Sequence, residues 1–363
     1  MKKLFILLYT GLAGILTACE TILPVDVPEG EEWGITLNAV ASPDTTFTAY
    51  VTHSYPNSEA PEYHYKQIYD GVHWEPTPFL DYYYSMLYPY GKTEDAPPFN
   101  NNGGYNTIKE ATLADAKVEL TVNGETDYPM VYDTLMLCFQ SNYTPAIGDR
   151  LEVRIDNGSG ERTIARTEVP RPQKLEILDI EKEIFDKSEF LANEVGFYRN
   201  RGYLTMKLRL HDPAEEKNHY RLAIRGSHHK FDSMYGVWDT YMSSDPIFKD
   251  DRLTSGWNAW PAFFSNVFDD TLINGKTYEF EVKTYILGSL DLNEEWPIYE
   301  VSLQSITEDY YRYLKSMQLY RISRTDAHSE GVYIHSNNEG GWGLLGGISG
   351  EVHRIEPFKD YHE

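Results

Sequence analysis

The sequence predicts a mainly β protein with two antiparallel β-domains and one helix. Three observations support this prediction: segments in which apolar and polar residues alternate, turn sequences rich in asparagine and glycine, and one segment with helical periodicity. The chain has 363 residues, which is more than a single hydrophobic core usually supports, so two domains are expected.

The first half of the chain predicts an immunoglobulin-like antiparallel sandwich over residues 33–170. Apolar and polar side chains alternate most clearly at Lys117–Val122 and Leu151–Ile155. Asn123-Gly124 follows the first of these strands and is typical of a tight hairpin turn. Thr163–Val169 is expected to pair back after a second turn. The remaining predicted strands are Trp33–Val40 and Phe47–Thr52.

Residues 173–363 predict a second antiparallel β-domain, which begins after the stiff sequence Pro170-Arg171-Pro172. Its segments again combine apolar alternation with β-branched and aromatic residues, the composition that favours strands. The predicted strands are Leu175–Ile180, Tyr203–Leu210, His219–Arg225 and Thr277–Leu287.

One segment of the second domain, at about residues 305–321, predicts a helix. Ser305 with Glu308 fits a capping box, and Thr307 is an alternative cap. Tyr310, Leu314 and Met317 are spaced i, i+4, i+7, so they form one apolar stripe along the helix. We therefore expect a helix of about four turns that packs on the second β-domain.

The N-terminus predicts a lipoprotein signal peptide over residues 1–18. Met1-Lys2-Lys3 precedes an apolar stretch that is too short to span a bilayer well as a permanent helix. The stretch ends in Leu16-Thr17-Ala18-Cys19, the lipobox pattern, in which the cysteine thiol is acylated after cleavage. Residues 19–32 combine prolines and acids without periodicity, which is typical of an extended tether.

Net charge limits the partners of the mature chain. Without residues 1–18 it keeps 30 Lys and Arg against 56 Asp and Glu, a formal charge of −26. A chain this acidic does not bind nucleic acid or anionic lipid electrostatically. We therefore expect acyl chains on Cys19, not a basic surface, to attach it to the membrane.

After lipidation of Cys19, Cys138 is the remaining thiol, so no intramolecular disulfide is expected. Cys138 lies in the apolar run Leu135–Phe139. A nucleophilic cysteine needs a partly exposed, electropositive setting. The run predicts a buried, structural cysteine instead.

An unusually long segment, residues 55–107, interrupts the first domain and is rich in tyrosine and proline. Such a long loop inside a compact domain is usually functional or disordered, and its aromatic content argues against disorder. Three interpretations stay open: the tyrosines pack on their own sandwich, contact a protein or peptide, or form a platform for a glycan. The candidate contact residues are Trp74, Tyr82, Tyr83, Tyr84, Tyr88 and Tyr90.

The remaining motifs do not predict a catalytic centre, a metal site or a cofactor. Gly341–Gly346 has the spacing of a dinucleotide-binding loop, but no helix is expected after it, so turns beside a strand are predicted. His228-His229 lacks further ligands at zinc-type spacing. The acidic segments Asp156–Glu161 and Asp291–Glu295 lack a complete calcium-loop pattern. A non-enzymatic protein is expected.

Three segments of the chain resemble a Bacteroidota lipoprotein family that is known only as a domain of unknown function. The closing motif, Ser305–Lys315 with Val332–Asn338 and Gly340–Gly347, carries most of the resemblance. Asn218–Leu222 resembles the mid-chain motif of the family, and Trp33–Ile35 resembles its first strand. In typical members the link before Lys117 is much shorter than here.

The resemblance implies an outer-membrane lipoprotein that works with a TonB-dependent transporter and has no established enzymatic activity. We therefore expect a lipid-anchored protein on the outer face of the outer membrane, where Glu20 after the lipobox also resembles a surface-export signal. It would be a binding or gating accessory of a β-barrel transporter, with a glycan or peptide as a possible ligand. The alternative is a structural or assembly component of surface complexes that binds no nutrient.

Overall fold

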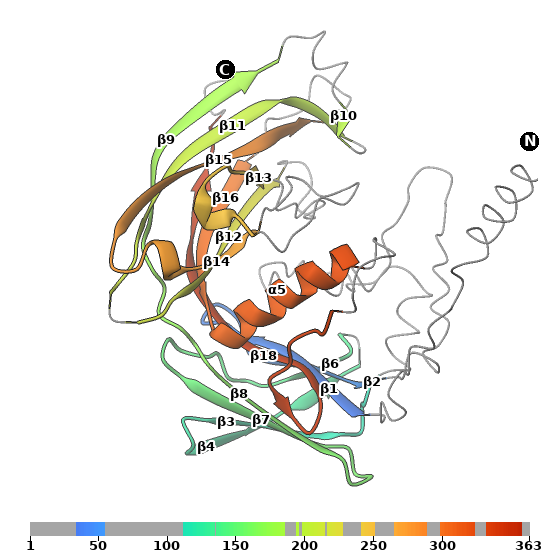
Figure 1. The fold of residues 1–363 in the computed structure, drawn as a ribbon. Helices are drawn as coiled ribbons and strands as arrows, with labels where there is room; N and C mark the ends of the chain where they lie inside the picture. Colours follow the sequence, from blue (N-terminus) through green and yellow to red (C-terminus); the bar gives the residue numbers. More distant parts are fainter. Residues whose placement is uncertain are drawn as a thin grey trace, which may run out of the picture. The chain divides into compact units, whose positions relative to one another are not determined.

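The fold is known from a computed structural model that describes residues 34–54, 112–134, 136–185, 194–195, 198–214, 216–227, 241–250, 265–288, 298–323 and 332–357. All of these residues belong to one compact unit. They form a mainly β structure with one α-helix among the described residues, α5 (Glu308–Ser323) (Figure 1). The predicted fold class, mainly β with a single helix near the C-terminus, is confirmed.

The largest sheet has eight strands. Their order is β14 (Val267–Asp269), β12 (His219–Ser227), β16 (Ile298–Ile306), β18 (Trp342–Ile355), β1 (Gly34–Ala41), β2 (Thr48–Ser54), β6 (Cys138–Gln140) and β5 (Val131–Asp133). The first and last long strands of the described chain, β1 and β18, pair in parallel, whereas the other described strand pairs are antiparallel. Strands from both sides of Pro170 therefore share this sheet.

Two five-stranded sheets complete the β structure. One contains β10 (Glu194–Val195), β11 (Tyr198–His211), β15 (Thr277–Gly288) and β13 (Tyr241–Met242), with β9 (Leu175–Ile184) also paired to β11. The other has the order β17 (Asn338–Glu339), β8 (Arg162–Glu168), β7 (Arg150–Asp156), β3 (Lys117–Val122) and β4 (Thr126–Pro129). The short helices η1 (Pro246–Phe248) and η2 (Asp270–Leu272) flank β14 in sequence.

Helix α5 and the two smaller sheets cover opposite faces of the large sheet. Val301 and Leu303 of β16 pack with the β11–β15 core, whereas Ile306 packs with α5. Successive side chains of a strand point to opposite faces, so these contacts separate the two sides. Leu303 pairs with Glu351 of β18, so these two side chains point to the same face. Leu345 lies on that face of β18 too, and it packs with the β3–β7–β8 core. Both smaller sheets therefore cover the same face.

The alternation that predicted the strands corresponds to burial in the structure. In β1 every second residue is buried, and the buried positions pack against the buried positions of β3 and β7. The hairpin turn predicted at Asn123-Gly124 is also present, and both residues have positive φ angles. Each predicted strand lies within a strand of the structure or differs from it by one or two residues. Cys138 is buried, as predicted.

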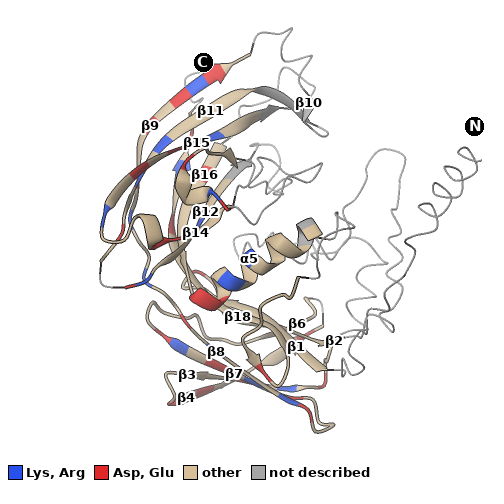
Figure 2. Cartoon of the chain, in the orientation of Figure 1, with Lys and Arg blue, Asp and Glu red and all other residues tan. Residues whose placement is uncertain are grey.

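The predicted helix start was wrong by three residues. Ser305 is a buried residue of β16, and α5 begins at Glu308. Thr307, the alternative cap, fills that role, because its carbonyl oxygen accepts a hydrogen bond from the Tyr311 amide at 2.9 Å. The predicted apolar stripe of Tyr310, Leu314 and Met317 is buried against the sheet. The helix therefore exposes an acidic first turn followed by Arg312 (Figure 2).

The glycine-rich segment predicted as turns also begins the longest strand of the large sheet. A turn at Gly340 is followed directly by β18. Here glycine allows backbones to approach closely. A Cβ atom on Gly347 would lie 1.8 Å from the Glu168 carbonyl oxygen, and one on Gly346 would lie 3.0 Å from the Tyr310 ring. Glycine at these positions therefore lets β18 fit between β8 and α5.

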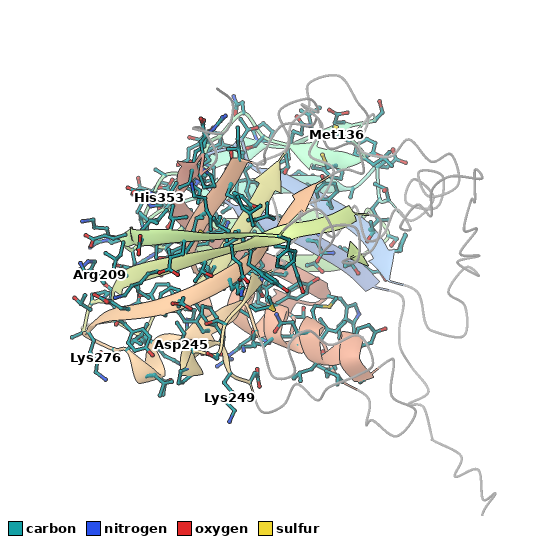
Figure 3. All side chains as sticks on the ribbon, turned by 90° about the horizontal axis from the view of Figure 1, so that it is seen from above. Met136, Arg209, Asp245, Lys249, Lys276 and His353 are labelled. Atoms are coloured by element: carbon teal, nitrogen blue, oxygen red, sulfur yellow. The ribbon has the colours of Figure 1, made fainter. Side chains whose placement is uncertain are left out.

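A buried ion pair connects α5 to the segment after β13. The Lys315 ammonium donates to Asp250 Oδ2 at 2.8 Å and to Ser265 Oγ at 2.9 Å. Both charged side chains are more than nine-tenths buried. By contrast, ion pairs such as that of Arg209 with Glu279 lie on the outer surface, where Arg209 points away from the strands (Figure 3). Exposed pairs of this kind contribute little to stability.

We predict that Gly347→Ala destabilises the protein by about 1–3 kcal/mol. The new methyl group would clash with the Glu168 carbonyl oxygen, and a backbone atom cannot move aside as a flexible side chain can. Urea unfolding gives this value. Val352→Ala, at a half-exposed position of the same strand, should stay within about 0.5 kcal/mol of the parent. Equal stability of the two variants would contradict the close approach of β18 and β8.

We predict that Asp250→Asn lowers the free energy of unfolding by about 3–5 kcal/mol, because it leaves the buried Lys315 charge without its carboxylate. Glu308→Gln is the matched control, since it removes the exposed pair with Arg312 and should cost only about 0.3–0.5 kcal/mol. A small effect of Asp250→Asn at neutral pH would show that the pair is not needed to hold α5.

Candidate functional site

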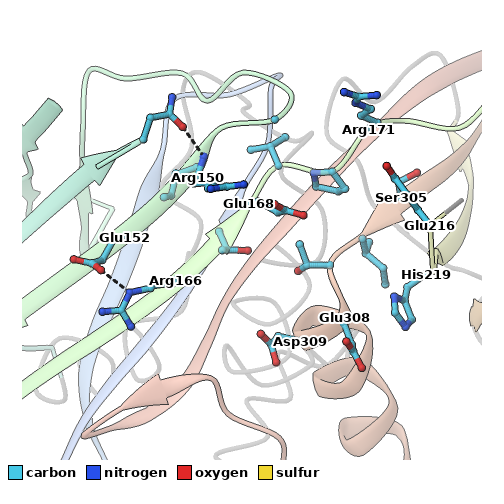
Figure 4. A pocket seen from close by; sticks show the side chains of 18 of the residues that line it. Arg150, Glu152, Arg166, Glu168, Arg171, Glu216, His219, Ser305, Glu308 and Asp309 are labelled. Carbon is cyan, nitrogen blue, oxygen red and sulfur yellow. Dashed lines mark hydrogen bonds and ion pairs between the residues drawn. The ribbon is translucent and has the colours of Figure 1, made fainter. Parts of the chain in front are cut away.

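A cleft of about 1040 Å³ lies between the β7–β8 sheet and the start of α5 (Figure 4). Its other wall is formed by the start of β12 and the end of β16. The charged residues that line it are Arg150, Glu152, Arg154, Arg166, Glu168, Arg171, Glu216, Lys217, Glu308 and Asp309. Five cations thus face five acids, whereas the chain has 32 cations and 56 acids in total. The cleft is electrically balanced on a strongly acidic protein.

The β7–β8 wall carries a ladder of ion pairs. The Glu152 carboxylate accepts hydrogen bonds from Arg166 at 2.5 Å and forms an ion pair with Arg154. Arg166 also donates to Glu339 at 2.6 Å. These bonds raise the pKa of Arg166, chiefly through Glu152. The ladder orients these side chains, so they form a fixed polar wall.

The acids at the start of α5 have partners within the protein. Glu308 pairs with Arg312 at 2.6 Å, and Asp309 accepts from His335 at 2.8 Å. Thr307 is also fixed, because its Oγ1 accepts a hydrogen bond from the Gly347 amide at 3.1 Å. The first turn of the helix is therefore held in position beside β18.

Three cations and two acids of the cleft have no ion-pair partner among the described residues. They are Arg150, Arg171 and Lys217, and Glu168 and Glu216. All five are exposed, so their charges are accessible from the cleft. A polar ligand that carries both charges, such as an extended peptide, can pair with groups of either sign here.

Two buried polar side chains of the cleft also lack hydrogen-bond partners within the described structure. His219 and Ser305 are each more than nine-tenths buried, and His219 Nε2 and Ser305 Oγ make no hydrogen bond. The His219 ring lies on the Tyr311 ring, with centroids 4.7 Å apart. Buried polar atoms are normally satisfied, so these two atoms are exceptions within the described structure.

His219 is neutral near physiological pH. Burial lowers its pKa from the ordinary value of 6.5, and the Lys217 charge lowers it further, against the opposite effect of Glu308, Asp269 and Asp270. The neutral ring can donate or accept one hydrogen bond at Nε2, depending on its tautomer.

Ser305 and His219 cannot act together as a nucleophile and its base. His219 pairs with Ile306, whereas Ser305 pairs with Tyr220. Neighbouring strand positions point to opposite faces, so the two side chains lie on opposite sides of the β12–β16 pair. A nucleophile needs its base within hydrogen-bond reach, so these two side chains do not form a nucleophile–base pair.

The site residues predicted from sequence lie outside the described residues. This holds for Cys19, for the tyrosine-rich segment 55–107 and for the motifs at His228-His229 and Asp291–Glu295. The tyrosine-rich segment includes Trp74, Tyr82, Tyr83, Tyr84, Tyr88 and Tyr90. Asp156–Glu161, which is described, is the β7–β8 turn, and its Asp156 and Asn157 side chains bond to backbone amides of the turn.

The cleft was not predicted from the sequence, although His219 and Ser305 both belong to motifs that were noted for other reasons. His219 belongs to the mid-chain motif Asn218–Leu222, and Ser305 was predicted as a helix cap. A histidine at the buried end of an alternating strand is the signal that could have identified it.

Within the described part of the chain, no group of three or more His, Cys, Asp or Glu side chains is arranged to hold a metal ion. No helix in that part is both long and apolar enough to cross a membrane.

The family model of a domain of unknown function, DUF4249, matches residues 20–353. The chain belongs to this family. The match begins at Glu20, directly after Cys19, and takes in every described strand except the last residues of β18. The resemblance to a domain of unknown function, predicted from the closing motif, is thereby confirmed for DUF4249. Comparison with curated proteins found no match.

We predict that His219 makes this DUF4249 protein less stable in mild acid. Because its folded pKa is lowered, the unfolded chain takes up the proton first as the pH falls below about 6.5, so folding stability decreases there. His219→Gln should remove this part of the pH dependence. Urea unfolding at neutral and mildly acidic pH measures how the free energy of unfolding changes with pH in the parent and in the variant. The same change in both proteins would contradict a buried, neutral His219 ring.

Proposed function

We propose that this DUF4249 protein is a lipid-anchored lipoprotein on the outer face of the outer membrane. It acts as a binding or gating accessory of a β-barrel, specifically a TonB-dependent transporter. The Leu16–Cys19 sequence supports the anchor, and the acidic tether that follows supports a chain held at some distance from the lipid. Glu20 and the resemblance to Bacteroidota lipoproteins support the outward orientation.

One observation about the described strands carries the partner proposal. Gly34, the first residue of β1, pairs with Ser54, the last residue of β2, and Thr52 bridges to Thr112. The tether from Cys19 thus joins the domain where residues 55–111 leave and rejoin it. A tyrosine-rich segment that follows Ser54, the residue paired with Gly34 at the start of β1, is well situated to contact a membrane-embedded partner.

The cleft supports a binding role in addition. Its balanced charges suit a polar ligand, and a peptide matches the mixed charges better than a neutral glycan. We propose that the protein presents such a ligand to the transporter.

Affinity purification from native membranes tests the partnership. We expect the full chain to recover a β-barrel in gentle detergent, and a variant lacking residues 55–107 to remain folded but lose that barrel. Thermal unfolding and circular dichroism of the variant show whether it is folded. Purification of the full chain alone would contradict the proposal, and a variant that cannot fold would show that the tyrosines belong to the core.

Cys19→Ala tests the anchor separately. We expect the parent to incorporate labelled palmitate and to be cleaved by protease added to whole cells, and the variant to lose the label. The alternative function, assembly of surface complexes, predicts a general envelope defect in a deletion strain. The accessory function predicts a growth defect restricted to particular nutrients.

A further inference from the structure

Two aromatic side chains are exposed at the start of β18. Tyr333 is 71% exposed and Trp342 is 40% exposed, although large aromatic residues are usually well buried. Their rings contact each other edge to face, with centroids 6.2 Å apart. They therefore form one joint aromatic surface, which we call the Tyr333–Trp342 pair.

The Tyr333–Trp342 pair lies at the end of the large sheet that receives the tether. Trp342 pairs with Thr36, two residues after the start of β1. Gly34 follows Cys19 by fifteen positions, and a chain of that length reaches at most about 50 Å. The pair is thus held near any bilayer to which Cys19 is attached.

The opposite end of β1 faces the cleft. Ala41 pairs with Gly347, which contacts Glu168 and Thr307 of the cleft walls. Thr36 and Ala41 are five positions apart, which is about 17 Å of strand, so the pair lies at the other end of β1 from the Gly347 side of the cleft.

We propose that the Tyr333–Trp342 pair inserts into the headgroup layer of the bilayer that holds the lipid anchor, and so directs the cleft away from the membrane. Tyrosine and tryptophan combine an apolar ring with a polar tip, the combination enriched at membrane–water interfaces. An acidic chain is repelled by anionic lipid, so contact with neutral headgroups is the favourable case. The proposal rests on the lipid anchor of the proposed function.

Because the acyl chains already attach the protein to the bilayer, a small contact is enough to orient it. Two side chains do not hold a protein on a membrane alone, but a tethered surface has a high effective concentration at the bilayer. The pair therefore sets orientation and depth, whereas the acyl chains supply the attachment.

Chemical anchoring tests the contact independently of lipidation in the cell. In residues 19–363 carrying Cys138→Ala, Cys19 is the one thiol left, and it is coupled to a maleimide lipid in phosphatidylcholine vesicles. The fluorescence of Trp342 is obtained as the difference between this protein and its Trp342→Phe variant. We expect that component to shift to shorter wavelength on coupling and to be quenched by brominated phosphatidylcholine.

Hydrogen exchange provides the second measurement. Coupling should protect residues 332–344 but not residues 305–309 at the cleft, and Tyr333→Ser with Trp342→Ser should abolish the protection. The control is Val131→Ser with Ile147→Ser, which removes exposed apolar side chains elsewhere and should leave the protection unchanged. An unquenched Trp342 component with unchanged exchange would overturn the proposal, whether or not Cys19 is lipidated in cells.

A photo-crosslinking residue at position 333 distinguishes the bilayer from a protein partner in native membranes. Crosslinks to lipid support the proposal, and crosslinks to a membrane protein would overturn it in favour of a protein interface.

Discussion

The parallel pairing of β1 with β18 is the constraint on which the rest of this structure depends. It joins the first and last long strands of the described chain, and through it the β1–β2–β6–β5 end of the large sheet is continuous with the β14–β12–β16 end. The smaller sheets then cover one face of this sheet, and α5 covers the other. Without the pairing, each half would keep a long unpaired strand edge.

Side-chain amides and glycines make this pairing specific. Asn338 donates to the Leu37 carbonyl oxygen at 3.0 Å, and Asn337 exchanges hydrogen bonds with the backbone of Leu345. The glycines of β18 permit the backbone of β8 and the ring of Tyr310 to approach. The Val332–Asn338 and Gly340–Gly347 parts of the closing motif are therefore largely structural residues around β18.

Much of the fold could be predicted from sequence because burial follows alternation in β1, β3, β7 and β8. The first part of β18 could not, because glycines at 343, 346 and 347 remove the alternating side chains that mark a strand. The helix start was wrong for a related reason: Ser305 fits a cap locally, but its backbone pairs with Tyr220 and Ser349. The cleft is lined by β7, β8, β12 and α5, which are far apart in the sequence. A local sequence pattern cannot predict that such distant elements lie together.

The β1–β18 pairing also has a consequence for when this protein can fold. Thr36 and Trp342 are about 300 residues apart in the chain, so the large sheet cannot close until nearly all of the polypeptide is available. Contacts this distant in sequence cost loop-closure entropy and form late. A growing chain would thus have β1 paired with β2 but without its other partner, β18. The pairing of β18 is therefore the step that commits the chain to its final structure.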